Sequence, residues 1–398
     1  MNLNKTQILY RLIQLLAFMI PLSQFLSVRL LFFICIYSLF VNEMSGSFRR
    51  FLKNSWDAIL YLLILLLGLL YSDDLNLGLR TMETSFSLLA FPIIFSKIAP
   101  LQQNQLNTVL KSFVVGLLIA CTICLWSSAL LFYQNGEIST FFYYQFAQKI
   151  ELQPTYLAYY LCFAITIGLY FLYYEMAKVP SWFLVLIVLY LFAILMLTAG
   201  RTAYISILLT FSFFILKYLY EERAGTIKTI TFLISILLLI GILIVNHFDL
   251  NTSYINAEEN NDFWERLVLW KAALQANPNF LFGVGTGDYK LVLNQYFISH
   301  DLQRFAMSSY NSHNQFIQIL FSNGLIGLIS LVFLIGRPIY LSLKHQNILG
   351  ILIFFPFLIY GVTEVFLGRY QGVVFFSFLH QCLISHYSIN ASDSKGRI

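Results

Sequence analysis

Long, continuous runs of apolar side chains dominate this chain of 398 residues and exclude a water-soluble fold. An α-helix needs about 20 consecutive apolar residues to cross the hydrocarbon core of a bilayer, and several of the runs reach that length. Overall, 59% of the residues are hydrophobic and 11% are charged, whereas a soluble domain has about 25% charged residues. The solvent for most of this chain is therefore lipid.

The runs predict an all-α fold, a polytopic bundle of about twelve membrane spans. Spanning β-sheets would need short segments of alternating polarity, and these runs are continuously apolar. The predicted spans lie near residues 7–25, 26–41, 57–71, 82–98, 108–133, 153–174, 182–199, 202–220, 228–247, 314–335, 347–362 and 369–387. The chain then divides into residues 1–247 with spans 1–9, a large periplasmic loop at 248–313 with short amphipathic helices, and residues 314–398 with spans 10–12 and a short cytoplasmic tail.

The positions of Lys and Arg predict the orientation, because cytoplasmic loops carry an excess of these residues. With both termini in the cytoplasm, every alternate connection that is rich in Lys and Arg also becomes cytoplasmic. The net charge of +5 is spread along the chain in short patches, so a nucleic-acid partner is not expected.

Several charged residues collect at the predicted outer ends of the spans: Arg80, Glu83, Glu151, Arg201, Glu364 and Arg369. A charge that faces the bilayer centre costs about 2.5–3.5 kcal/mol, so such side chains are expected to face a cavity. The alternative for each of them is a solvated or snorkelling residue at a helix end. Arg201 stands out because it occupies a very tight turn between two long apolar runs, TAGRTAY.

The loop is expected to contain an amphipathic helix that lies along the membrane surface, NDFWERLVLWKAALQAN. Asp262 and Glu265 form a capping-box pattern at its start, and its apolar side chains, Trp264, Leu267, Trp270 and Leu274, recur at helical spacing. Arg266 lies near its first turn, where it can reach an anionic headgroup or substrate. The GVGTG stretch that follows is expected to be a turn that lets two backbones approach closely.

A second capping-box pattern, Ser312 with Gln315, predicts that His313 is the first or second residue of a spanning helix. The positive end of the helix dipole favours the neutral imidazole, which can accept a proton, and the free amides nearby attract anions. A general base is one interpretation of His313. The alternative is a histidine with a structural role at a helix start.

These motifs stand in an order that resembles the O-antigen ligase and polymerase superfamily. The resemblance rests on a GRTA turn at Arg201, the outer helix with Arg266, NPNFLFGVGTGDY, and the helix opening HNQFIQILFSNGLIG. Two fainter similarities are QPTYLAYYL from Gln153 and TEVFLGRYQG from Thr363.

The resemblance implies a glycosyltransferase of the bacterial inner membrane whose active site faces the periplasm. Such an enzyme moves a glycan from undecaprenyl pyrophosphate to an acceptor hydroxyl by inverting transfer. Among these activities, O-antigen ligase activity on lipid A core is favoured over polymerase activity. Polymerases that resemble this superfamily usually have two long outer loops, and only the connection after about residue 248 is long here. A polymerase with a glycan acceptor, a protein O-oligosaccharyltransferase and a transporter of the lipid-linked glycan remain the alternatives.

The chemistry of this transfer assigns roles to the candidate residues. Arg201 and Arg266 are expected to bind the diphosphate through bidentate contacts, and His313 is expected to deprotonate the acceptor. No acidic pair or histidine cluster with metal-binding spacing is apparent, so neither a metal nor another cofactor is expected. Arg80 and Arg369 are further candidates for donor binding, and four residues are possible supporting groups: Glu151, Tyr156, Asn314 and Glu364.

Overall fold

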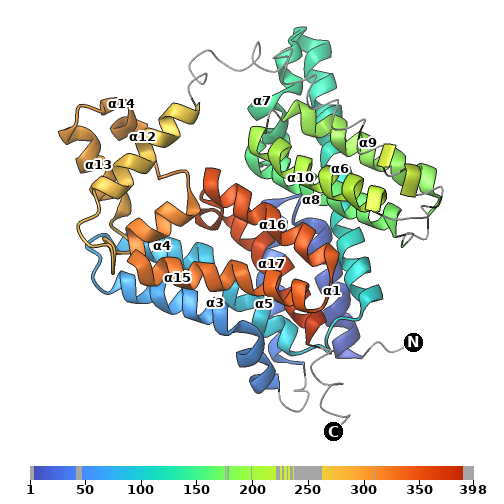
Figure 1. Ribbon diagram of the computed structural model, residues 1–398, viewed down its shortest axis with the longest axis horizontal. Helices are drawn as coiled ribbons and strands as arrows, with labels where there is room; N and C mark the ends of the chain where they lie inside the picture. Colours follow the sequence, from blue (N-terminus) through green and yellow to red (C-terminus); the bar gives the residue numbers. More distant parts are fainter. Residues whose placement is uncertain are drawn as a thin grey trace. The chain divides into compact units, whose positions relative to one another are not determined.

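Every regular element is a helix in the residues that the computed structural model describes (Figure 1). Those residues are 4–41, 47–174, 176, 179–198, 200–220, 225, 228–230, 232, 233, 236, 262–308 and 310–388. The all-α class is therefore confirmed for this part of the chain. The apolar stretch at 228–247 and the loop before residue 262 lie largely outside the described residues.

The chain folds as two compact units, each assembled from separate stretches of sequence. The first unit comprises Met1–Leu12, Leu30–Leu106 and Asn261–Ile398, and the second comprises Ile13–Arg29 and Asn107–Asn260. This division follows packing, whereas the division expected from the sequence follows membrane topology.

The second unit surrounds one almost completely buried helix, α8 (Pro154–Tyr173). Its neighbours α9 (Ser181–Leu197) and α10 (Arg201–Tyr220) pack against it, and Phe113 of α6 (Gln103–Asn135) meets Tyr160 edge-on. The connection from α6 to α8 consists of three short helices, η1 (Ile138–Phe141), α7 (Tyr143–Ala147) and η2 (Gln148–Ile150).

The first unit is built around α3 (Ser47–Leu69) and α15 (Gln315–Lys344), which pack side by side (Figure 1). Its remaining helices in the described residues are α4 (Leu75–Ser85), α5 (Ser87–Ser96), α12 (Asp262–Gln275), α13 (Tyr289–Ser299), α14 (Gln303–Ser308), α16 (Ile348–Thr363), η5 (Phe366–Gly368) and α17 (Tyr370–Tyr387). The boundaries between the units fall within α1 (Lys5–Met19), α2 (Gln24–Leu39) and the first turn of α6.

Five helices in the described part of the chain are long and apolar enough to cross a membrane: α3, α6, α8, α10 and α15. Three shorter helices, α2, α9 and α16, are also apolar. Helices occupy the predicted spans other than 228–247, but a count of twelve stays a prediction. The stretch 82–98 differs from the expected single span, because it divides at Phe86, whose N–H bonds to Glu83 three residues back.

The helix expected here is present as α12, which lies with α13 and α14 (Figure 1). The three helices share one hydrophobic core with Phe321 of α15. Leu269, Ala272 and Ala273 are the α12 residues buried in this core. Trp264 and Leu274, which share the expected apolar face, are instead exposed. The Glu265 carboxylate pairs with Arg304 of α14 at 2.8 Å. The expected capping box stays a prediction, because the side chain of Asp262 lies outside the described residues.

The glycine segment Gly283–Asp288 binds two membrane helices through its backbone. The amides of Val284 and Gly285 donate to the carbonyls of Phe321 and Ser322 in α15, and the amide of Thr286 donates to Gly68 of α3. The close approach expected from the GVGTG sequence is thus confirmed. It depends on glycine, because Gly283 has a φ of 75° and a Cβ there would collide with the backbone of α15.

The segment binds α15 at a break in that helix. Gly324 has a φ of 66° and a ψ of −164°, which interrupts the helical backbone. The interruption releases carbonyl groups that the loop amides then satisfy, as buried backbone groups require. Asp288 completes the attachment, because its carboxylate accepts from the amides of Asp73 and Asp74 after α3 at 2.9 and 2.8 Å.

Candidate active site

His313 directly precedes Asn314, the N-cap of α15, so the helix begins two residues later than expected. The N-cap of α15 is Asn314, whose side-chain oxygen accepts from the amides of Phe316 and Ile317 at 2.9 and 3.0 Å. Ser312 does not cap the helix, because its hydroxyl donates to the Asn314 carbonyl and to Gln318 Oε1. Asn314 and Ser312 are both good capping residues, and Asn314 takes the position.

The backbone of His313 adopts a left-handed conformation, with a φ of 44°. Its amide donates to the side chain of Asn311 at 2.9 Å, which fixes the turn. A non-glycine residue in this region usually costs about 1–3 kcal/mol. The turn leaves the imidazole partly exposed and directs its Nδ1 atom toward Glu364.

Glu364 lies between α16 and η5, and its Oε2 atom is 3.6 Å from Nδ1 of His313. This separation is longer than a hydrogen bond. Burial alone would raise the pKa of Glu364, but the interaction with His313, an amide of Val365 and the charge of Arg266 together hold that pKa below its usual range. Two residues that the sequence singled out, His313 and Glu364, thus lie side by side, and the charge of a third, Arg266, acts on Glu364.

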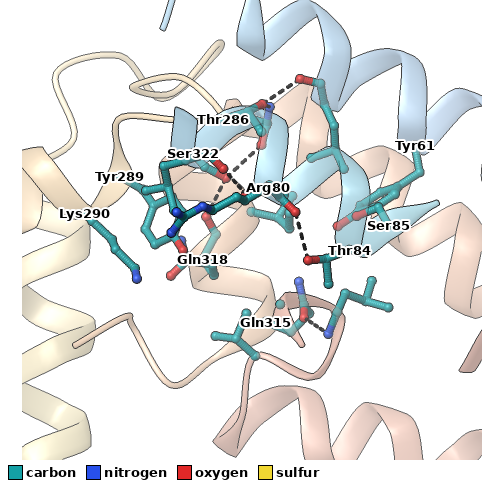
Figure 2. A pocket seen from close by; sticks show the side chains of 18 residues that line it. Tyr61, Arg80, Thr84, Ser85, Thr286, Tyr289, Lys290, Gln315, Gln318 and Ser322 are labelled. Atoms are coloured by element: carbon teal, nitrogen blue, oxygen red, sulfur yellow. Dashed lines mark hydrogen bonds between the residues drawn. The ribbon is translucent and has the colours of Figure 1, made fainter. Parts of the chain in front are cut away.

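A cavity of about 160 Å³ lies in the same unit (Figure 2). The helices α3 and α4 contribute Tyr61, Leu65, Leu77, Arg80, Thr81, Thr84 and Ser85. Thr286 and the first residues of α13, Tyr289 and Lys290, form another part of the lining. The rest comes from α15, with Gln315, Gln318, Ile319, Ser322 and Asn323, and from Val365, Leu367 and Gly368. Its wall therefore includes the first turns of α15 and the segment after Glu364. The same two elements carry the cluster of His313 and Glu364.

The lining of this cavity is positively charged. Arg80 and Lys290 are its charged lining residues, and no carboxylate joins them there. The charge of Arg369 also acts on the lining, because it lowers the pKa of the lining residue Tyr289. Burial raises the pKa of Tyr289 to about 12 although Arg369 opposes the shift, so this tyrosine stays neutral at physiological pH.

The remaining candidates from the sequence belong to the second unit. Arg201 is the exposed first residue of α10, directly after the tight turn that was expected between two apolar helices. Glu151 ends η2 in a left-handed conformation and is exposed, whereas Tyr156 is buried in α8. Within the described residues, no group of three or more His, Cys, Asp or Glu side chains is arranged to hold a metal ion.

Sequence reasoning missed three polar residues of the cavity: Lys290, Gln315 and Gln318. A signal for the glutamines existed, since Gln315, Gln318 and Ser322 follow one another at helical spacing along a helix that is otherwise apolar. Lys290 is a lone lysine in the part of the sequence expected to be a loop, and no comparable pattern marks it.

Comparison with known proteins bears on this arrangement. Residues 186–332 match the protein family described as O-antigen ligase. This range is less than half of the chain, and over it the chain is similar to that family. The matched range contains Arg201, Arg266 and His313 together with the cavity residue Lys290.

The match supports a glycosyltransferase-type domain of the O-antigen ligase or polymerase kind, and the apolar helices support a membrane protein. An uncharacterized protein of Haemophilus influenzae is 24% identical over 151 residues. The match covers 35% of this chain and 37% of that relative.

Proposed function

We propose that this protein is an O-antigen ligase of the bacterial inner membrane. It would transfer a glycan from undecaprenyl pyrophosphate to a hydroxyl of lipid A core on the periplasmic side. The observation that carries the proposal is the pair of His313 and Glu364, an imidazole with a carboxylate partner, together with the charge of Arg266 that acts on Glu364.

In the proposed reaction, His313 takes the proton of the acceptor hydroxyl. The acceptor oxygen attacks the anomeric carbon of the donor from the face opposite the diphosphate, so that one C–O bond forms as the other breaks and the configuration inverts. The bonding electrons and the negative charge leave with undecaprenyl pyrophosphate. The Glu364 carboxylate orients the imidazole and stabilises the imidazolium that forms, as the carboxylate of a catalytic triad does.

Cations are the second requirement of this reaction, because the leaving group is a diphosphate. We propose that Arg266 binds it through bidentate contacts, with Arg369 as a further cation of the donor site. The same role for Arg201 stays a prediction from the sequence, and Arg80 lines the cavity described above. The charge of Arg266 acts on Glu364, which supports its role. Glu151, Tyr156 and Asn314 are supporting residues in the proposal, and the Asn314 side chain holds the helix start that follows His313.

The primary experiment measures transfer of a labelled glycan from its polyprenyl diphosphate carrier to lipid A core by the purified protein in liposomes. We expect transfer by the parental protein and a rate lower by about 10²–10⁴-fold for His313→Ala, the usual contribution of a general base. Donor binding should change little, because His313 contacts the acceptor side. If the properly inserted His313→Ala protein transfers at the parental rate, another group is the base.

A polymerase is the alternative, since it joins the same donor to a second glycan. The short helical connection between α6 and α8 favours the ligase, because polymerases that resemble this superfamily usually have two large outer loops. A deletion strain separates the two functions. Long glycan chains that remain on the carrier, without capped lipid A core, support the ligase, whereas carrier-linked chains that stay short support the polymerase. Movement of the labelled lipid across the liposome without transfer would support a transporter.

A further inference from the structure

The cavity next to His313 presents hydrogen-bond donors from several sides. Gln315 and Gln318 are both buried, and protein donors occupy their carbonyl oxygens. Leu367 N–H donates to Gln315 Oε1 at 2.8 Å, and Ser312 N–H donates to Gln318 Oε1 at 3.1 Å. Because a backbone N–H can only donate, these bonds fix which end of each amide is oxygen. The NH₂ group of each glutamine is thereby left to serve the cavity as a donor.

Arg80 and Lys290 add charged donors to the same space (Figure 2). Neither forms a salt bridge with a described residue, and the cavity wall contributes no carboxylate to neutralise them. Arg80 comes from the last half of α4 and Lys290 from the first turn of α13, so the two cations approach from different elements. A ligand with an anionic group and further acceptor oxygens would satisfy all four donors.

The rest of the lining is suited to the hydroxyl groups of a sugar. The hydroxyls of Thr84, Thr286 and Ser322 donate to backbone carbonyls. Thr286 Oγ1 also accepts from the Asn323 amide, so each hydroxyl keeps at least one lone pair that can accept from a ligand. The volume of about 160 Å³ is close to that of a cavity known to hold one six-membered ring. The space therefore fits one sugar residue.

We propose that this cavity is a subsite for one acidic sugar residue of the glycan substrate. Arg80 and Lys290 bind its carboxylate or phosphate group, and the NH₂ groups of Gln315 and Gln318 donate to its other oxygens. The proposal rests on the proposed function, because it assumes that the protein handles glycans, and it adds a preference for charged ones.

Equilibrium binding tests the subsite without any need for catalysis. Ligand-observed NMR of the full-length protein in detergent compares D-galacturonate and D-galactose 6-phosphate with neutral D-galactose and with inorganic diphosphate. We expect at least one acidic sugar to bind about tenfold or more tightly than galactose. Arg80→Gln and Lys290→Gln should each weaken this binding about 10- to 100-fold, the usual effect of losing a charge-assisted contact.

Lys271→Gln is the matched control, since Lys271 is an exposed lysine of α12 that does not line the cavity. Binding by this variant should equal that of the parental protein. As a second measurement, a thiol reagent should label Leu77→Cys, in the cavity lining, more slowly when the acidic sugar is present. Equal affinity for galactose, insensitivity to both variants, or tighter binding of diphosphate than of either acidic sugar would each overturn the subsite. Binding retained by His313→Ala, with or without transfer, separates this proposal from the function of the whole protein.

Discussion

At the scale of single residues, the proposed base and its carboxylate meet because two backbone segments leave regular structure at the same place. His313 is held in a left-handed turn by Asn311, and Glu364 follows the last residue of α16 in an extended conformation. Neither side chain would reach the other from the interior of its neighbouring helix. The strain at His313 is of the kind that is retained at functional sites.

The low pKa of Glu364 makes a prediction about stability and pH. Since its pKa in the folded protein lies below the usual value of 4.5, ionised Glu364 stabilises the fold fully above about pH 4.5, and this contribution is lost as the pH falls through the lower, folded value. Glu364→Gln should therefore lower the unfolding temperature at pH 7, and its difference from the parental protein should shrink only as the pH falls below about 4.5 toward 3. Unfolding temperatures in detergent across this range measure the effect. A difference that does not vary with pH would contradict the assigned ionisation.

The two arginines are expected to behave differently from the base. Arg266→Ala and Arg201→Ala each remove a proposed contact to the diphosphate, so donor affinity as well as turnover should fall, by about 10- to 100-fold. Lysine at either position should restore only part of the loss, because its ammonium cannot form the bidentate contact. Donor titrations of the transfer rate give both quantities. Full restoration by lysine would show that only the charge matters, and unchanged donor affinity would exclude the residue from the diphosphate site.

At the scale of elements, a buried ionic cluster joins three helices of the first unit. Asp57 of α3 is completely buried, with Arg337 of α15 at 2.6 Å and His380 of α17 at 2.8 Å. Arg337 also donates to the carbonyls of Lys53 and Asn54. The cluster fixes how α15 and α17 lie against α3. Of these helices, α3 and α15 line the cavity, and α15 begins just after His313.

Removing one charged member of this cluster should lower the stability of the fold more than removing two. Asp57→Leu leaves the guanidinium of Arg337 buried without its carboxylate, and such a change typically destabilises a protein by about 3–5 kcal/mol. The double variant Asp57→Leu/Arg337→Met leaves no charge without a partner in the pair and should recover part of that loss. Unfolding temperatures in detergent compare the two, with Lys344→Met, an exposed lysine of the same helix, as the control. A double variant less stable than Asp57→Leu would contradict the argument.

The sequence predicts the helices of this protein better than the places where they are interrupted. Apolar runs mark helices because the lipid environment demands them, and α12 was predicted from its periodicity. The break at Gly324 was not predicted, since a glycine in an apolar helix is tolerated without a break. The choice of Asn314 over Ser312 as the cap depends on Gln318, whose side chain engages Ser312.

Contacts between distant segments could not be predicted at all. Asp57 and His380 are 323 positions apart, and nothing in a single sequence pairs them. Their presence within apolar runs is nevertheless a signal, because an ionisable group in a membrane span is costly and needs a partner. For the same reason, the grouping of charges at helix ends correctly selected Arg80 as a residue that faces a cavity.

At the scale of the whole molecule, the proposed periplasmic position of the site depends on membrane orientation. A single cysteine introduced at Asn256 should react with an impermeant thiol reagent in intact cells, and one introduced at Glu222 should react only after permeabilisation. Of the five native cysteines, four are buried and Cys35 is partly exposed, so a Cys35→Ser background gives the lowest unwanted labelling. The reversed pattern would place His313 on the cytoplasmic side and would overturn the proposed function.

The attachment of the Gly283–Asp288 segment also determines where the chain can be lengthened. An epitope tag inserted there would push apart α3 and the broken part of α15, and the carbonyls freed by the break would lose their donors. Gly136 is a contrasting position, because a side chain placed there would meet nothing within 4 Å and the nearby Tyr133 is 89% exposed. Reporter fusions and antibody epitopes for following this protein in cells therefore belong between α6 and η1, and the glycine segment should be left intact.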